Sequence, residues 1–133
     1  MKKLLILALI AFSTFNAFSQ NLQKGNLVGL HTVTVKLNAK TTMDQLVDFM
    51  STKWTAAESK FYSCDVKLLK YVRGIAVGTD KLTFLIIYKD AASRNKFYNP
   101  DGTTNEGGKA AEAKMKSITD EFNKLASIVK NEY

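Results

Sequence analysis

The sequence predicts a small α+β protein with the element order β-α-β-β-α, in which two helices pack on one face of a mostly antiparallel sheet. Three segments have the patterns of strands, with alternation of apolar and polar residues clearest in the first, and two segments repeat apolar residues at helical spacing. In addition, one of the strands is apolar on both sides, as expected of a strand that is covered on both faces. So few elements form one layer of strands with the helices beside it.

The first strand and the first long helix are the clearest elements. Residues 27–37 alternate, with one strongly apolar side. Over residues 43–61, apolar residues recur at steps of three and four, which predicts an amphipathic helix of about five turns. Thr41 or Thr42 is the expected N-cap, because a threonine oxygen can accept a hydrogen bond from a free N–H of the first helical turn.

Two further strands follow, separated by a glycine-rich turn region. The second strand is predicted over residues 66–73 and the third over residues 81–89. The third strand has apolar residues on both sides, with Leu82, Phe84, Ile86 and Tyr88 on one side and Leu85 and Ile87 on the other. It is therefore expected to be buried from both faces.

The C-terminal part predicts helical structure on both sides of a long loop. A helix begins near Asp90, its expected cap, and covers residues 90–98. The last helix is predicted over residues 109–130, where apolar residues again recur on one side. The glycines of the loop between them, residues 99–108, allow two interpretations: a plain surface loop, or a mobile flap with the glycines as its soft points.

The first nineteen residues are predicted to be an export signal that is removed after Ser19. Lys2 and Lys3 form a positive start, the apolar run that follows is too short to span a bilayer, and small residues precede the cut. Residues 20–133 then form a single domain. We expect a periplasmic or secreted protein, with the bacterial envelope favoured, and no membrane span.

Composition argues against several classes of function. The 19 basic residues exceed the 12 acidic ones, so the net charge is +7, or +5 without Lys2 and Lys3. The basic residues are scattered and nearly all lysine, so nothing points to nucleic acid. The single histidine, His31, cannot build a multi-histidine zinc site, and no phosphate loop or dinucleotide fingerprint occurs, so we expect no metal and no cofactor. The single cysteine, Cys64, is expected to be a half-buried residue at the start of a strand.

The side of the sheet that faces away from the helices needs a cover. Leu69 and Tyr71 on the second strand, like both sides of the third strand, are too apolar to be left to water. The chain has no further predicted element for this face, so we expect a second copy of the chain to pack on it about a twofold axis. The predicted partner is therefore the protein itself, as a homodimer with a cavity between two sheets.

Two short segments resemble those of a known superfamily. Residues 30–36, Leu-His-Thr-Val-Thr-Val-Lys, are of the type with which its first strands open, and residues 88–94, Tyr-Lys-Asp-Ala-Ala-Ser-Arg, resemble one of its strand–helix junctions. On these residues the chain resembles the dimeric α+β barrel superfamily, and within it the NIPSNAP-like and antibiotic-biosynthesis-monooxygenase-like branches.

This resemblance implies a ferredoxin-like subunit that pairs through its sheet, with a cavity between sheet and helices or within the barrel. Members of the superfamily include cofactor-independent oxygenases, haem-degrading enzymes and proteins with no known activity. The haem-degrading members use a histidine on a helix to bind iron. Neither predicted helix of this chain contains a histidine, which argues against that role.

A few side chains are candidates for chemistry or ligand binding. His31, Tyr71 and Arg73 are the candidate catalytic residues, the histidine as a general base and the arginine as a clamp for a carboxylate ligand. Each also has a structural interpretation, as a packed strand histidine or as a surface arginine leaning on an aromatic ring. The predicted ligand-binding residues lie on the first and third strands and are Thr32, Thr34, Phe84 and Tyr88.

Three hypotheses of function remain open. The first is a protein that binds a small apolar or aromatic ligand in a cavity of the sheet-paired dimer. The second is a cofactor-independent enzyme of the monooxygenase or isomerase kind, and the third is an envelope interaction protein without a ligand. An apolar pocket favours the first, a pocket that unites His31 with Tyr71 or Arg73 favours the second, and a filled core favours the third.

Overall fold

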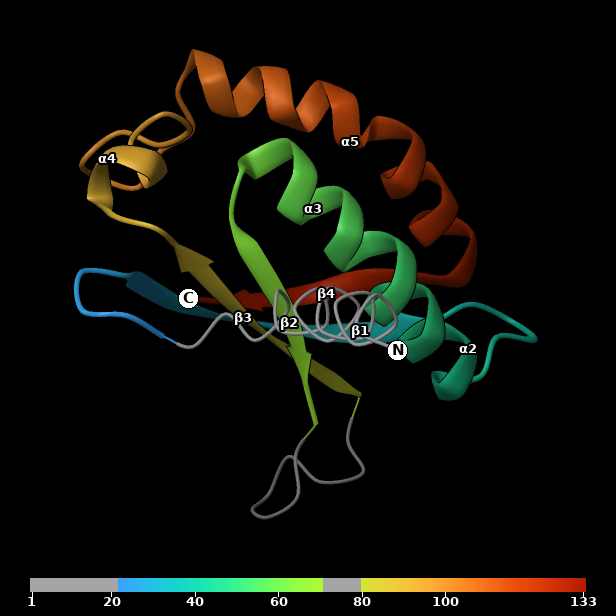
Figure 1. The fold of residues 1–133 in the computed structure, drawn as a ribbon. Helices are drawn as coiled ribbons and strands as arrows, with labels where there is room; N and C mark the ends of the chain where they lie inside the picture. The colour runs from blue at the N-terminus through green and yellow to red at the C-terminus, as the bar shows by residue number, and fades with distance from the viewer. Residues whose placement is uncertain (1–21, 71–79) are drawn as a thin grey trace, which may run out of the picture.

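The computed structural model describes residues 22–70 and 80–133, which form one sheet with helices packed against it (Figure 1). In chain order the elements are β1 (Leu27–Leu37), α2 (Met43–Phe49), the π-helical turn η1 (Met50–Trp54), α3 (Thr55–Tyr62), β2 (Asp65–Leu69), β3 (Lys81–Tyr88), α4 (Ala91–Arg94), α5 (Glu106–Leu125) and β4 (Ala126–Glu132). The predicted α+β class is confirmed, and the predicted order of elements is followed by one further strand.

The four strands form an antiparallel sheet in the order β2-β3-β1-β4, with β3 and β1 at its centre. The pairing of β1 with β3 runs from Leu27 opposite Tyr88 to Thr34 opposite Lys81. Helices α3 and α5 lie side by side over one face of this sheet (Figure 1). The arrangement is compatible with a ferredoxin-like fold. Within the described ranges, no helix is both long and apolar enough to cross a membrane.

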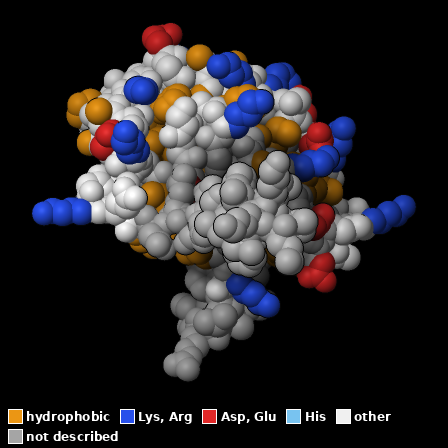
Figure 2. Space-filling view, in the orientation of Figure 1, with side chains coloured by type: hydrophobic (Ala, Val, Ile, Leu, Met, Phe, Trp, Pro, Cys, Tyr) orange, Lys and Arg blue, Asp and Glu red, His pale blue; other side chains and the backbone are white. Residues whose placement is uncertain are grey.

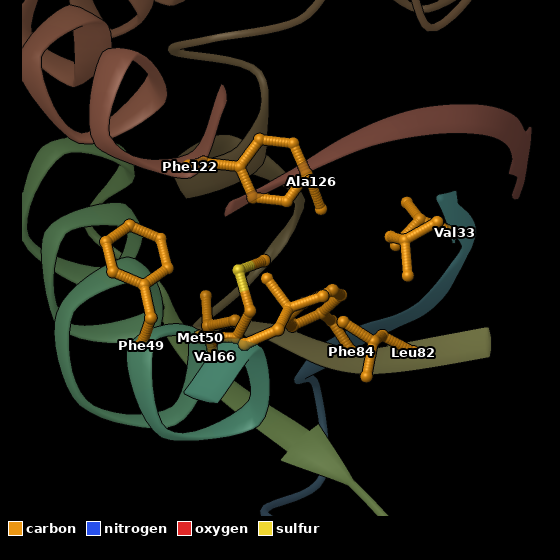
Figure 3. Close-up of a cluster of buried hydrophobic side chains, with 10 residues drawn as sticks. Val33, Phe49, Met50, Val66, Leu82, Phe84, Phe122 and Ala126 are labelled. Carbon is orange, nitrogen blue, oxygen red and sulfur yellow. The ribbon is translucent and has the colours of Figure 1, made fainter. Parts of the chain in front are cut away.

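The hydrophobic core lies between the sheet and the helices. Val33 and Val35 on β1, Leu46 on α2 and Phe122 on α5 are all buried in one cluster. Figure 3 shows strand residues such as Val33 and Phe84 on the side of the sheet that faces the helices. The side of the first strand that the sequence marks as apolar is thus the side that is buried.

Local hydrogen bonds fix where the helices begin. The Oγ1 atom of Thr42 accepts a hydrogen bond from the N–H of Gln45 at 3.2 Å, and the Gln45 side chain accepts one from the N–H of Thr42 at 2.9 Å. Asp90 caps α4 by accepting a bond of 2.7 Å from the backbone N–H three residues later. Asn105 caps α5 in the same way at 3.1 Å. The caps predicted at Thr42 and Asp90 are therefore confirmed.

The helix predicted over residues 43–61 is present, but the π-helical turn η1 interrupts it. The hydroxyl of Thr52 donates a hydrogen bond to the carbonyl of Asp48 at 2.6 Å. Such side-chain bonds compete with the backbone hydrogen bonds of a regular α-helix. The wider turn rotates all later side chains around the helix axis. As a result Tyr62 is buried, whereas the predicted apolar stripe reached Phe61, which is only half-buried.

The helix predicted over residues 109–130 is wrong at its C-terminal end. Helix α5 ends at Leu125, and Ala126 is extended, with φ −156° and ψ 171°. The chain then forms β4, which pairs antiparallel with the free edge of β1. The β-branched residues Ile128 and Val129 suit a strand better than another helical turn, and pairing with β1 satisfies the backbone groups of both strands.

Two other predicted elements are shorter in the structure. The second strand was expected over residues 66–73, but β2 ends at Leu69, and residues 71–79 lie outside the described part of the chain. The helix expected over residues 90–98 is the single turn α4. Its continuation is replaced by hydrogen-bonded turns, one of them held by the side chain of Asn105, which donates to the carbonyl of Asn95 at 3.0 Å.

The face of the sheet away from the helices has an apolar zone at the N-terminal end of β1. Leu30 is 56 % exposed there, and Val28 and the β2 residue Leu69 are exposed as well. Leu85 and Ile87 of β3 lie directly opposite Leu30 and Val28 in the antiparallel register and are half-buried. The described helices do not cover this zone (Figure 1).

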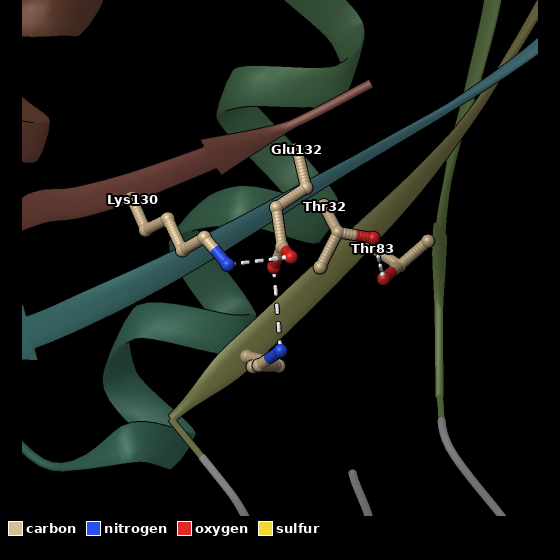
Figure 4. Close-up of polar contacts among 5 residues, drawn as sticks. Thr32, Thr83, Lys130 and Glu132 are labelled. Atoms are coloured by element: carbon tan, nitrogen blue, oxygen red, sulfur yellow. Dashed lines mark hydrogen bonds and ion pairs between the residues drawn. The ribbon is translucent and has the colours of Figure 1, made fainter.

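Further along the same face the side chains are polar. The hydroxyls of Thr32 and Thr83 lie 2.7 Å apart across β1 and β3. Glu132 of β4 lies between two lysines, with its carboxylate 3.3 Å from Nζ of Lys81 and 2.8 Å from Nζ of Lys130 (Figure 4). This face therefore combines an apolar zone with a zone that carries charges of both signs.

Candidate functional site

A cavity of about 1020 Å³ lies between the sheet and helices α3 and α5. The first half of β1 and the end of β3 form its floor, the two helices form its walls, and the segment after α4 forms its rim. Its aromatic, polar and charged lining includes His31, Trp54, Glu58, Tyr62, Tyr88, Arg94, Tyr98, Asp101, Glu112 and Tyr133. A concave, mostly aromatic space with a few polar groups is the usual form of a small-molecule site.

Three cavity residues follow one another along one side of the helix that contains α3. Trp54, Glu58 and Tyr62 are spaced four residues apart, so they lie one above the other. The indole Nε1–H of Trp54 donates a hydrogen bond to Oε2 of Glu58 at 2.8 Å. Burial raises the pKa of Glu58, and the hydrogen bond from Trp54 opposes part of this rise. Glu58 is thus a partly desolvated acid that is held in place by its neighbour.

Three tyrosines line the cavity near Glu58. The rings of Tyr62 and Tyr98 are stacked, with centroids 6.0 Å apart and planes at 13°. Burial is the largest cause that raises the pKa of Tyr62, of Tyr88 and of Tyr98. Their hydroxyls therefore stay protonated and serve as neutral hydrogen-bonding groups.

Cys64 lies behind this cluster, half-buried just before β2, as the sequence predicts. Burial raises the pKa of its thiol to about 12, the charge of Glu58 adds to the rise, and a hydrogen bond with Tyr88 reduces it. A thiol that stays protonated is a poor nucleophile and a poor metal ligand. Cys64 also packs against both buried hydrophobic clusters, which accounts for its burial.

His31 lies at the edge of the cavity nearest to β4. Its Nε2 is 3.2 Å from Oδ1 of Asn131, and its ring stacks on Tyr133 with centroids 4.3 Å apart and planes at 10°. Burial lowers the pKa of His31, and the contact with Asn131 opposes part of the change. The imidazole is therefore biased toward its neutral form.

We expect this histidine to make the fold less stable in mild acid. Because the pKa of His31 is lower in the folded chain than its ordinary value of 6.5, the unfolded chain binds a proton more readily as the pH falls. The free energy of unfolding should decrease between about pH 7.5 and 5.5, and His31→Gln should reduce this decrease. Urea unfolding at both pH values measures the difference, and an equal decrease in both proteins would contradict the assignment.

The rim of the cavity is held by hydrogen bonds within residues 94–105. Nη1 of Arg94 donates to the carbonyl of Asn99 at 2.8 Å, and the Arg94 guanidinium lies 5.2 Å from the centroid of the Tyr98 ring. The backbone N–H and hydroxyl of Thr103 both donate to Oδ1 of Asp101, at 2.9 and 2.7 Å. These contacts position Tyr98 at the cavity.

Two glycines of the predicted loop belong to helix α5 instead. Gly107 and Gly108 lie in its first turn, where a Cβ atom would meet the backbone carbonyls of Lys96 and Phe97, respectively. They allow the helix to approach the preceding segment closely. The interpretation of these two residues as soft points of a flap therefore does not hold, whereas Gly102, with φ +88°, does sit in a turn.

The structure brings some of the predicted site residues together. His31 and Tyr88 both line the cavity. Phe84 lies on the same face of the sheet but is only 3 % exposed and belongs to the core. His31 and Phe84 are directly opposite in the pairing of β1 with β3, with ring centroids 6.3 Å apart, so the histidine lies where the cavity floor meets the core.

The other predicted site residues are elsewhere. Thr32 and Thr34 project from the opposite face of the sheet, because side chains alternate along β1 and Val33 and Val35 face the helices. Tyr71 and Arg73 lie outside the described residues.

Sequence reasoning missed most of the cavity residues, among them Glu58, Tyr62 and Tyr98. Glu58 was assigned no role, because it falls outside the apolar stripe from which the helix was recognised. The spacing Trp54-x3-Glu58-x3-Tyr62 places three polar-tipped or acidic groups on one helix side, and this was the available signal. No such spacing marks Tyr98, whose position depends on the turns after α4.

Comparison of the chain with protein-family models, with curated proteins and with solved structures finds no match. Within residues 22–70 and 80–133, no group of three His, Cys, Asp or Glu side chains is placed to hold a metal ion. Figure 2 shows the Lys and Arg side chains spread around the visible face of the molecule. The function must therefore be argued from the cavity itself.

Proposed function

We propose that this protein binds a small, largely apolar ligand with an aromatic ring in the cavity between the sheet and helices α3 and α5. One observation carries the proposal, which is the size of this cavity, about 1020 Å³, in a small domain. The space is partly open to solvent, as an accessible binding cleft is, and it is bounded by the sheet and both helices. Small-molecule sites typically enclose about 300–1,000 Å³.

The lining supports an aromatic ligand. Trp54, Tyr62, Tyr88 and Tyr98 contribute rings, and aromatic pairs prefer offset or edge-to-face contacts that a bound ring can complete. The polar groups are few and converge near Glu58, so they can orient a ligand by one or two hydrogen bonds. A purely structural envelope protein would have no need of such a lining.

Trp54 makes this proposal testable without a label, because it is the chain's single tryptophan. We expect 2-phenylethanol to change the fluorescence of Trp54 in a saturable way. Gly29 lies in the cavity floor, and a Cβ atom added there has nothing within 4 Å. Gly29→Leu should therefore fill part of the cavity and weaken binding about tenfold or more, without lowering the melting temperature.

Gly29→Ala is the matched control, because it adds one methyl group to the same backbone position and leaves most of the cavity open. It should bind 2-phenylethanol nearly as well as the unmodified protein. No saturable change in any of the three proteins would contradict the proposed function and favour an envelope interaction protein without a ligand. Equal binding by Gly29→Leu would place the ligand elsewhere.

A second part of the proposal is that two copies pair through the open face of the sheet, as in the dimeric α+β barrels that the chain resembles. The exposed apolar zone around Leu30 supports this pairing. So does the polar zone, because a surface that carries both Lys81 and Glu132 can complement itself about a twofold axis. The ferredoxin-like subunit and the NIPSNAP-like or monooxygenase-like relationship belong to the same proposal.

We expect Leu30→Lys to convert the dimer to a monomer, because it places a charge at the centre of the proposed apolar contact. Val129→Lys is the control, since Val129 is 59 % exposed on the edge strand β4. Light scattering at micromolar concentration gives the mass of each protein. A monomeric mass for the unmodified protein would contradict the pairing.

The third part of the proposal concerns location. Residues 1–19 are proposed to direct export to the periplasm or the medium and then to be removed. The argument is the positive start, the short apolar run and the small residues before Gln20. A mature protein whose mass corresponds to a first residue at Gln20 is the expected result.

A second candidate function is a cofactor-independent enzyme of the isomerase kind. One observation favours it: the partly desolvated acid Glu58 lies in the same cavity as protonated tyrosine hydroxyls, an arrangement that suits proton transfer. Deuterium exchange from solvent into a ligand that co-purifies with the protein, abolished by Glu58→Gln, would support the enzyme. Recovery of the ligand without exchange would support simple binding.

A further inference from the structure

The polar groups of the cavity specify the charge of its ligand. We infer that the ligand is an organic cation, an aromatic amine or a substituted ammonium compound whose positive group lies against Glu58. This inference rests on the proposed function and adds to it the chemical class of the ligand. Three observations carry it: the environment of the Glu58 carboxylate, the rings around it, and the balance of charge in the cavity wall.

The first observation is that Glu58 has room for another donor. Its Oε2 accepts the hydrogen bond from Trp54, and within the described part of the chain the structure gives no hydrogen bond to Oε1. The carboxyl group is partly withdrawn from water, which makes a lone negative charge costly and a nearby positive charge favourable. An ammonium group can supply both a positive charge and a further hydrogen bond to the carboxylate.

The second observation is the set of aromatic rings in the same cavity. Trp54, Tyr62, Tyr88 and Tyr98 present π-systems, which attract cations to their faces. The protein already uses one ring in this way, because the Arg94 guanidinium lies 5.2 Å from the centroid of Tyr98. Aromatic rings together with a carboxylate form the kind of site that recognises alkylated ammonium groups.

The third observation is that the cavity wall is acidic in a basic protein. Among the described residues, the wall contains the carboxylates of Glu58, Asp101 and Glu112 and one guanidinium, that of Arg94, although the chain has a net charge of +7. Asp101 accepts hydrogen bonds from Thr103, and Glu112 accepts one at 3.1 Å from the hydroxyl of Thr104. These two acids are therefore engaged with the rim, and Glu58 is the one placed to meet a ligand.

The same charges disfavour an anionic ligand. A carboxylate ligand would face Glu58 in a partly desolvated space, where like charges repel more strongly than in water. Arg94 does not offset this repulsion, because its guanidinium is held against the rim by the carbonyl of Asn99. The expected order of affinity for molecules of one shape is therefore cation, then neutral molecule, then anion.

The test compares three probes of similar shape by isothermal titration calorimetry of the full protein. The probes are 2-phenylethylamine, which is cationic at neutral pH, 2-phenylethanol, which is neutral, and phenylacetate, which is anionic. We expect the amine to bind about tenfold or more tightly than the alcohol, as a charge-assisted hydrogen bond is about twice as strong as a neutral one. Phenylacetate should bind more weakly than the alcohol.

Glu58→Gln should remove the preference, so that the variant binds the amine no more tightly than the alcohol, because the amide carries no charge while its oxygen still accepts from Trp54. Glu112→Gln is the matched control and should keep the preference, since that acid is engaged with Thr104. Binding of the alcohol with no preference for the amine would overturn the inference and leave the proposed function standing. Failure of all three probes to bind would overturn both the inference and the proposed function. The comparison of the three probes uses the unmodified protein, so it does not depend on the folding of a variant.

Discussion

Phe122→Ala should lower the free energy of unfolding by about 3–5 kcal/mol, the usual cost of deleting a buried phenylalanine ring. Phe122 is 3 % exposed on α5 and packs in the cluster that includes Val33 and Leu46. Its ring also meets Trp54 edge-on, with centroids 5.5 Å apart and planes at 63°. The substitution therefore leaves a void between helix and sheet and removes a support of the cavity wall. Urea unfolding measures the first effect.

The control for this prediction is Val129→Ala, which shortens an exposed side chain on β4. It should change the free energy of unfolding by less than about 0.5 kcal/mol. The Phe122→Ala protein should also show a shifted Trp54 emission before any unfolding, because Trp54 loses a packing partner. A cost for Phe122→Ala as small as that of the control would mean that α5 does not pack on the sheet as described.

A chain that ends at Leu125 should not fold cooperatively. It lacks β4, which pairs with β1 along Thr32–Leu37 and places Ala126, 1 % exposed, in the core. Its loss would turn β1 into an edge strand and open the side of the core next to Phe122. The total stability of a small domain is only about 5–15 kcal/mol, so we expect thermal denaturation followed by circular dichroism to show no cooperative transition.

A chain that lacks only Tyr133 is the control for the truncation. Tyr133 is 94 % exposed and lies beyond β4, so its removal costs no core packing and only the ring contact with His31, and the melting temperature should fall far less than in the chain that ends at Leu125. The truncation also distinguishes the observed strand β4 from the alternative in which these residues continue the helix predicted over residues 109–130. If they only extended an exposed helix, their loss would cost little stability. A cooperative transition in the chain that ends at Leu125 would therefore argue against β4.

The parts of the fold that the sequence predicts well are those with strong local patterns. The alternation in β1, the apolar run of β3, the cap at Thr42 and the start of α4 after Asp90 all depend on neighbouring residues, and all are present. Strand alternation and side-chain capping act over a few residues, so they can be recognised without knowledge of the tertiary structure.

The parts of the fold that the sequence does not predict depend on residues that are distant in the chain or on small changes of helical pitch. Phe122, Leu125 and Val129 have helical spacing, and only the unpaired edge of β1 makes a strand after Leu125 more favourable than a longer helix. The wide turn η1 rotates the residues after it, so that Tyr62 replaces Phe61 on the buried side.

The candidate site is predicted less well than the fold for the same reason. His31 and Tyr88 were recognised from their strands, but the threonines of β1 were assigned to the site although they face away from the cavity. Glu58 becomes a candidate only when its burial beside Trp54 is known, because an exposed glutamate on a helix looks the same in sequence. Long-range packing, rather than local pattern, defines this site.

The most direct test of the account is a crystal structure of the protein grown with 2-phenylethylamine. The account predicts that the ring of the ligand lies in the cavity between the sheet and helices α3 and α5, among Trp54, Tyr62 and Tyr88. It also predicts that the ligand nitrogen lies within hydrogen-bonding distance of a Glu58 carboxylate oxygen. A cavity closed by its own side chains, or a ligand bound only outside it, would contradict the account.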